Sequence, residues 1–206
     1  MPMTTPPLGL RDQKKLARRE AMIQAAVRLA VERGVENALI EDITAAAGVS
    51  HRTFSNYFGG KAEAIAARHL DRARGVAEAL RARPAGEPLW DAITHAALSP
   101  YKADRKRPDP EGTASIRLMT SEPSLLGEFL KTNAIAEREL AEVVAERTGT
   151  KVTRDLYPRL VAATVWAAVE VATDKWLSTA KPAPITQLVR NALRQVAAGL
   201  PDPSAG

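Results

Sequence analysis

The side chains best suited to chemistry in this chain lie together between residues 50 and 57. Nearly every position there carries a hydrogen-bonding group: Ser50, His51, Arg52, Thr53, Ser55, Asn56 and Tyr57. On a short helix such groups can enter the major groove of DNA, where arginine favours guanine and asparagine favours adenine. Phe54 and Phe58 break the polar run at helical spacing and are expected to anchor the helix from behind. The stretch therefore predicts an exposed helix that reads base sequence.

A helix that reads bases needs a scaffold, and the residues before it predict one. A short helix is expected from about Ile40 to Ala47, with acidic residues in its first turn, where the helix dipole favours negative charge. Gly48 should end it in a tight turn that Val49 fills, and Ser50 is the expected N-cap of a helix through about Tyr57. Two short helices joined in this way have the size of a helix-turn-helix.

An amphipathic helix is expected ahead of this pair, from Asp12 to Arg33, with Gly34 ending it. Its leading end is basic, with Lys14, Lys15, Arg18 and Arg19. A run of charges usually does no more than face water. Beside a helix-turn-helix, contact with the DNA backbone is the better interpretation.

This part of the chain resembles the DNA-binding signature of the TetR family of transcriptional regulators. The resemblance rests on Ile43-Thr44-Ala45-Ala46-Ala47-Gly48-Val49-Ser50, then Thr53-Phe54, Tyr57-Phe58, Lys61 and Ile65. It implies that phosphates are held by Ser50, Tyr57 and Lys61, and by the basic residues Lys14, Lys15, Arg18 and Arg19. It implies that bases are read by His51, Arg52, Thr53 and Asn56. Phosphate contacts set register and salt-dependent affinity, whereas base contacts set sequence preference.

The sequence departs from the family pattern at the start of the second helix. The family usually has a threonine there, which serves as cap and phosphate contact, and this chain has Ala38-Leu39. Asn37 is expected to cap the helix instead, one or two residues early.

The rest of the chain also predicts helices, over residues 61–83, 89–102, 111–120, 122–147, 153–178 and 185–199, with a charged loop at 102–110. The expected fold is all-α with about nine helices. A three-helix DNA-binding domain is expected at 11–60, and a ligand-binding and dimerisation domain at 61–200. Residues 153–178 are apolar around most of the helix, so part of their cover is expected from a second subunit. The last two helices should then form a homodimer that sets two reading helices about 34–36 Å apart on palindromic double-stranded DNA.

Several residues in apolar helical surroundings are candidates for a ligand site: Trp90, His95, Arg117, Met119, Phe129, Asn133, Trp166 and Glu170. A buried polar group needs a partner, and a ligand can supply one. Ordinary core or interface packing is the commoner role for Met119, Phe129 and Trp166.

Composition limits the other classes of function. The net charge of +5 permits a polyanionic partner, and the absence of cysteine excludes disulfides and thiolate chemistry. His51, His69 and His95 form no paired metal-ligand motif, and no phosphate loop or nucleophile motif is present, so an enzyme is disfavoured and no cofactor is expected. No apolar run approaches the roughly 20 residues of a membrane span, and a cytoplasmic location is expected.

These observations predict a TetR-like repressor that a small lipophilic or aromatic ligand releases from a palindromic operator. One alternative stays open at this point. A regulator of the same fold can act without a small-molecule inducer, either constitutively or under the control of a protein partner.

Overall fold

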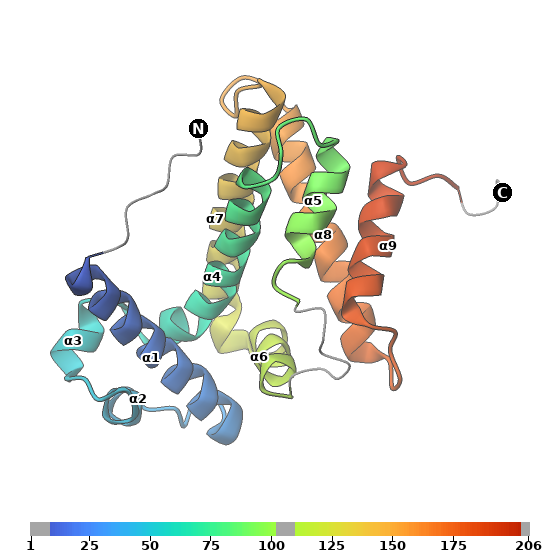
Figure 1. Ribbon diagram of the computed structural model, residues 1–206. Helices are drawn as coiled ribbons and strands as arrows, with labels where there is room; N and C mark the ends of the chain where they lie inside the picture. Colours follow the sequence, from blue (N-terminus) through green and yellow to red (C-terminus); the bar gives the residue numbers. More distant parts are fainter. Residues whose placement is uncertain (1–8, 102–109, 203–206) are drawn as a thin grey trace. The chain divides into compact units, whose positions relative to one another are not determined.

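The computed structural model describes residues 9–101 and 110–202. These ranges hold helices and no strand (Figure 1): α1 (Leu10–Arg33), α2 (Ile40–Ala47), α3 (His51–Ser55), α4 (Lys61–Arg81), α5 (Leu89–Leu98), α6 (Pro110–Ser121), α7 (Pro123–Thr148), α8 (Tyr157–Ser178) and α9 (Ile185–Ala197). The all-α class predicted from the sequence, with about nine helices, is confirmed.

The chain divides into two compact units. The first unit comprises Met1–Arg68 and Ala114–Phe129, and the second comprises His69–Thr113 and Leu130–Gly206. Helices α4, α6 and α7 therefore contribute residues to both units. The domain boundary expected near residue 60 stays a prediction, because the units are defined by contacts and not by independent folding.

The core of the first unit holds helix α3 in place. Helix α1 contributes Met22, Ile23 and Val27, and α2 contributes Ile43. Further core residues come from α3, α4, α6 and α7: Phe54, Ile65, Met119 and Leu125. A helix of five residues has too few internal hydrogen bonds to persist alone, so α3 depends on this packing.

Glycines end the first two helices as the sequence predicts. Gly34 and Gly48 have φ angles of 82° and 64°, in the region that side chains with a Cβ avoid. The cap expected from Asn37 is wrong. Leu39 is the N-cap of α2 and offers no side-chain bond, while Asn37 Nδ2 donates to the Arg33 carbonyl at 3.0 Å. Asn37 thus satisfies an unpaired carbonyl at the end of α1.

Two other helix ends differ from expectation for local reasons. Helix α5 ends at Leu98 and does not reach residue 102, because Pro100 has no N–H to continue the helical hydrogen bonds, although Ser99 keeps helical angles. Helix α8 begins at Tyr157 and not near residue 153, because a turn precedes it in which the Lys151 N–H donates to Asp155 at 2.8 Å. The loop expected at 102–110 lies outside the described residues, apart from Pro110, which begins α6.

In the second unit, α4 and α7 run side by side in the same direction. Arg74 pairs with Glu139 at 2.8 Å, and Arg81 pairs with Glu146 at 3.0 Å. Both partners advance by seven residues, which is about two helical turns, so the helices stay in register. Buried side chains from both helices enter the core of this unit: Val76, Leu80, Leu140, Val143 and Val144.

Across residues 9–101 and 110–202, no helix has both the length and the apolarity that crossing a bilayer requires. The same residues hold no group of three or more histidines and carboxylates placed to share a metal ion.

Candidate nucleic-acid interface

Helix α3 begins at the cap predicted from the sequence. Ser50 Oγ accepts a hydrogen bond from the Thr53 N–H at 3.1 Å and lies 2.9 Å from Thr53 Oγ1. This bond satisfies one of the unpaired N–H groups of the first turn. The predicted N-cap is confirmed, and both hydroxyls are held at the leading end of α3.

The two sides of α3 have opposite character. His51, Arg52, Ser55 and Asn56 are exposed. Phe54 is 1% exposed and Phe58 is 4% exposed, with ring centroids 5.5 Å apart. The aromatic anchors therefore pack inward as expected, and the polar edge points away from the core of its unit.

Ser55 orients the first exposed side chain of α3. Its Oγ donates to the His51 carbonyl at 3.1 Å and lies 3.4 Å from His51 Nδ1. The bonded ring nitrogen faces the helix, which leaves Nε2 to face outward. Ser55 was not predicted as a contact residue, although its spacing of four from His51 was the available signal.

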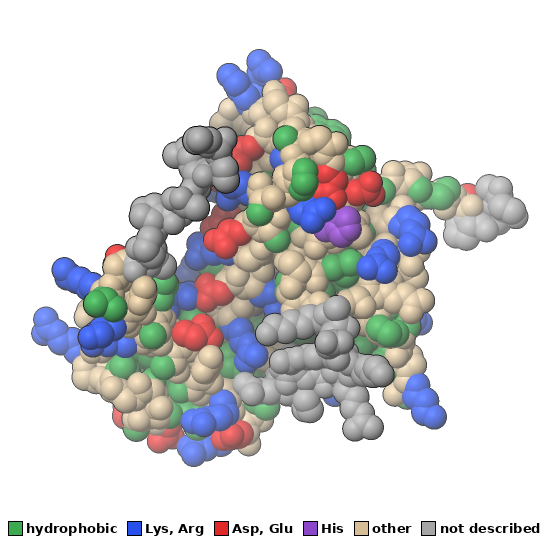
Figure 2. Space-filling model, in the orientation of Figure 1, with side chains coloured by type: hydrophobic (Ala, Val, Ile, Leu, Met, Phe, Trp, Pro, Cys, Tyr) green, Lys and Arg blue, Asp and Glu red, His purple; other side chains and the backbone are tan. Residues whose placement is uncertain are grey.

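The basic end of α1 lies beside the end of α3. Tyr57 Oη donates a long bond of 3.5 Å to the Lys15 carbonyl, and the Arg19 guanidinium lies 5.8 Å from the centre of the Phe58 ring. Lys14, Lys15 and Arg18 are exposed. Figure 2 shows Lys and Arg side chains gathered at the edge of the first unit where α1 begins. The basic residues and helix α3 therefore share one surface.

The start of α4 is fixed by two hydrogen bonds. Lys61 Nζ donates to the Glu36 carbonyl at 2.9 Å, and Glu63 accepts from the Gly59 N–H at 2.7 Å. An ammonium group has three donors, so Lys61 keeps capacity for a phosphate. Glu63 was not among the residues predicted from the sequence. The available signal was a glutamate in the first turn of a helix, which can reach back to an unpaired N–H.

The ligand candidates fall into two groups. Met119 is buried in the core of the first unit, Phe129 packs against that core, and Arg117 is exposed. The other five candidates belong to the second unit: Trp90, His95, Asn133, Trp166 and Glu170. Of these, Trp90 and Trp166 pack against the core of the second unit, whereas Glu170 is exposed on α8.

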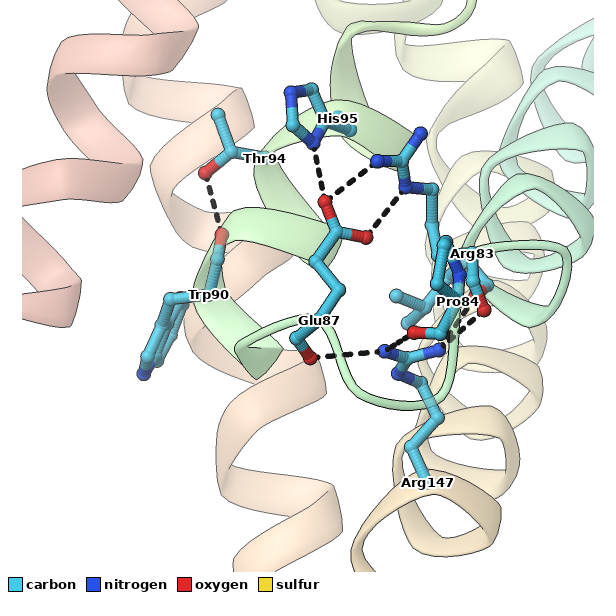
Figure 3. A network of polar contacts seen from close by, with 8 residues as sticks. Arg83, Pro84, Glu87, Trp90, Thr94, His95 and Arg147 are labelled. Carbon is cyan, nitrogen blue, oxygen red and sulfur yellow. Dashed lines mark hydrogen bonds and ion pairs between the residues drawn. The ribbon is translucent and has the colours of Figure 1, made fainter.

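His95 belongs to a polar network at the start of α5 (Figure 3). Its Nδ1 lies 2.9 Å from Glu87, and Arg83 donates to both oxygens of that carboxylate at 2.6 Å. The bonds from Arg83 lower the pKa of Glu87 to about 2, and His95 adds to this effect. Arg147 donates to the carbonyls of Pro84 and Glu87 at 2.9 and 3.3 Å. His95 therefore already has a partner within its own unit.

Asn133 forms a half-buried pair with His69. Asn133 Oδ1 lies 2.7 Å from His69 Nε2, which joins α7 to α4. Burial lowers the pKa of His69; the bond to Asn133 opposes the shift, and the charge of Arg72 adds to it. The imidazole is therefore neutral at pH 7, and Nε2 must carry the proton that it donates to the amide oxygen.

This pair predicts a pH dependence of stability. The unfolded chain takes up a proton near the ordinary histidine pKa, whereas folded His69 resists it, so the free energy of unfolding should fall as pH drops below about 6.5. The fall should not exceed about 1.4 kcal/mol per pH unit. Urea unfolding of the second unit at several pH values measures it. His69→Gln should flatten the dependence of the unfolding free energy on pH, and His51→Gln, at an exposed position, should not. Equal slopes in the wild type and both variants would refute the assignment of this pH dependence to His69.

Two family models match this chain. Residues 22–67 match the model described as bacterial regulatory proteins of the tetR family, and residues 87–201 match the model described as the MftR C-terminal domain. The chain is 31% identical over 173 residues to the HTH-type transcriptional regulator TcmR of Streptomyces glaucescens, across 82% of this chain and 76% of that protein.

Solved structures share the fold at lower identity. The fatty acid degradation regulator FadR of Bacillus halodurans gives a TM-score of 0.57 at 17% identity, across 87% of this chain and 94% of that one. FadR of Thermus thermophilus, a TetR-family repressor solved in complex with lauroyl-CoA, gives a TM-score of 0.56 at 17% identity, across 91% of this chain and 99% of that one. With both family models matched and TcmR 31% identical, this chain belongs to the TetR family of DNA-binding transcriptional regulators.

Proposed function

We propose that the protein is a homodimeric repressor that binds a palindromic operator and leaves it when a small lipophilic or aromatic ligand binds the second unit. The observation that carries this proposal is the surface shared by the polar edge of α3 and the basic end of α1. A major groove admits one helix, and the phosphates beside the groove then meet the basic residues.

The hydrogen bonds within α3 suggest how its side chains divide the work. Ser50 and Thr53 already bond to each other, so they suit backbone contacts at the leading end. Arg52 and Asn56 are exposed and lie four residues apart on one face. They suit base edges, with bidentate bonds to guanine and adenine, and His51 offers one outward nitrogen beside them.

A second copy of the chain fits the outer face of α8. Five exposed residues of α8 follow a spacing of three and four: Tyr157, Leu160, Thr164, Ala167 and Val171. Leu160 is 59% exposed and Val171 is 66% exposed. This heptad spacing is typical of helices that pair along their length, and the small residues at its centre permit close approach.

Charge on the last two helices also favours a second copy of the chain. Next to this stripe, α8 exposes Glu170 and Asp174, and α9 exposes Arg190 and Arg194. In a two-fold dimer, α8 of one protomer can face α9 of the other, so these opposite charges can pair. Glu170 suits this role better than a ligand contact.

A ligand can release DNA only by binding one dimer geometry more tightly than the other. One repressor of this fold was solved in complex with lauroyl-CoA, which supports an apolar ligand class. The three tryptophans and the aliphatic core of the second unit suit such a ligand.

Selection of DNA from a pool of random duplexes tests the proposal. The protein should enrich inverted repeats whose half-sites lie about 10 base pairs apart, or a small multiple of that spacing. It should retard these duplexes in a gel as a dimer. Enrichment of single, unpaired half-sites would contradict the dimeric assembly, and the absence of any enriched sequence at low salt would contradict base reading.

Two substitutions separate base contacts from phosphate contacts. Arg52→Ala should weaken binding to the selected operator by about 1–3 kcal/mol and relax the preference at one base pair in each half-site. Lys14→Ala should weaken binding to all sequences and reduce the salt slope by about 1. Lys151→Ala, at an exposed lysine of the second unit, is the control. Fluorescence anisotropy at several salt concentrations measures the DNA affinity of all three variants and its salt slope. Equal effects of Arg52→Ala on operator and random DNA would count against base reading.

A further inference from the structure

One buried donor in the second unit lacks an acceptor. Among the described residues, two buried side-chain atoms have no hydrogen-bond partner, Trp166 Nε1 and Thr113 Oγ1. A helical threonine normally donates to the carbonyl four residues earlier, and for Thr113 that carbonyl lies outside the described residues. An indole N–H points away from its own helix and has no such local acceptor. The gap at Trp166 is therefore not a consequence of helix geometry.

An unsatisfied buried N–H is costly, and proteins rarely keep one. Buried tryptophans normally place their N–H against an acceptor, and an orphan in a native structure points to a missing water, ion or ligand. Trp90 and Trp176 have no buried orphan nitrogen in the described part of the chain. The feature is thus specific to Trp166.

The position of Trp166 on α8 indicates where its acceptor must come from. Trp166 lies seven residues before Thr173, so the two share a face of the helix. Thr173 bonds to the Tyr101 hydroxyl, and burial raises the pKa of that phenol. Thr173 Oγ1 in turn donates to the Val169 carbonyl at 2.8 Å. The face of α8 that carries Trp166 is therefore turned into the second unit, away from the exposed stripe of Leu160 and Val171.

The neighbours of Trp166 limit the chemistry of the acceptor. Ala162 and Val169, one turn away on each side, and Val165 beside it are aliphatic and belong to or pack against the core of the second unit. A charged acceptor buried in such surroundings would carry a large desolvation cost. A neutral carbonyl oxygen is satisfied by a single hydrogen-bond donor, which the Trp166 N–H supplies.

We propose that Trp166 Nε1 donates a hydrogen bond to a carbonyl oxygen of an uncharged, largely apolar ligand held in the second unit. The assignment rests on the proposed ligand response, because it names the group that recognises the ligand. Apolar packing would supply most of the affinity, and the Trp166 N–H would select ligands that carry an acceptor.

Benzophenone and diphenylmethane test this as a matched pair, because they differ only in that the carbonyl group of the first is a methylene group in the second. Nitrogen-15 NMR of the full-length protein resolves the indole N–H groups, and Trp166→Phe identifies the Trp166 signal. If that variant does not fold, Trp90→Phe and Trp176→Phe identify it by elimination. Benzophenone should move the Trp166 N–H signal downfield, as hydrogen bonding requires, and diphenylmethane should not.

Binding measured by titration supplies the second readout. The wild type should bind benzophenone about tenfold more tightly than Trp166→Phe does, because one net hydrogen bond contributes about that much. The affinity for diphenylmethane should be the same in both proteins. Trp90→Phe should keep the wild-type preference. An unmoved Trp166 signal, equal binding of the two probes, or binding of neither would each overturn the assignment. No DNA enters these measurements, so a failure of the DNA-binding assay cannot produce any of these results.

Discussion

Leu160→Glu is expected to convert the dimer into a monomer and to weaken operator binding about a hundredfold, or by roughly 3 kcal/mol. Leu160 is 59% exposed on the protomer and lies in the heptad stripe of α8. In a two-fold dimer the substitution places two carboxylates against apolar partners, and each would be buried without a counter-charge. Light scattering coupled to size exclusion measures the oligomeric state, and gel retardation measures the affinity.

The matched control is Leu126→Glu. It makes the same chemical change at a leucine of α7 that is 51% exposed and lies outside the α8 stripe. It should leave the oligomeric state unchanged. If Leu160→Glu remains a dimer with full operator affinity, the subunits do not meet along this face of α8.

Phe54→Ala should unfold the first unit at moderate temperature and abolish DNA binding. Truncation of a fully buried phenylalanine costs about 3–5 kcal/mol, which is comparable to the whole stability of a small domain. Phe54 is 1% exposed and its ring centroid lies 5.5 Å from that of Phe58, so its truncation would leave a cavity in the core of the first unit. Hydrogen exchange measured by mass spectrometry should show lost protection in α1 to α3, with α8 and α9 protected as before.

Leu39→Ala provides the comparison for this experiment. Leu39 is 53% exposed, so its truncation should change stability by no more than about 0.5 kcal/mol. If Phe54→Ala and Leu39→Ala have similar stability, the inner side of α3 does not hold the reading helix in place.

Much of the first unit could be predicted from sequence because its signals are local. Helix α2 has the predicted bounds, since acidic residues open it and Gly48 closes it within eight residues. Ser50 caps α3 through a bond that spans three residues. The inward direction of Phe54 and Phe58 follows from their spacing on a helix.

What the sequence could not predict depends on contacts between distant residues or on competition for a group. Lys61 meets the carbonyl of Glu36, 25 residues away. The bonds of Arg74 and Arg81 cross 65 residues to α7. Asn37 had two helix ends within reach and bonds to the earlier one, which no propensity distinguishes. Met119 and Phe129 join the core of the first unit, although in sequence they lie between the two segments of the second unit.

Methylation protection of the selected operator with dimethyl sulfate is the most direct test of the reading helix. The reagent methylates guanine N7 in the major groove and adenine N3 in the minor groove. The wild type should protect guanines in two clusters on successive major grooves, and Arg52→Ala should lose protection of one guanine in each half-site. Protection confined to minor-groove adenines, or a pattern that Arg52→Ala leaves unchanged, would contradict insertion of α3 into the major groove.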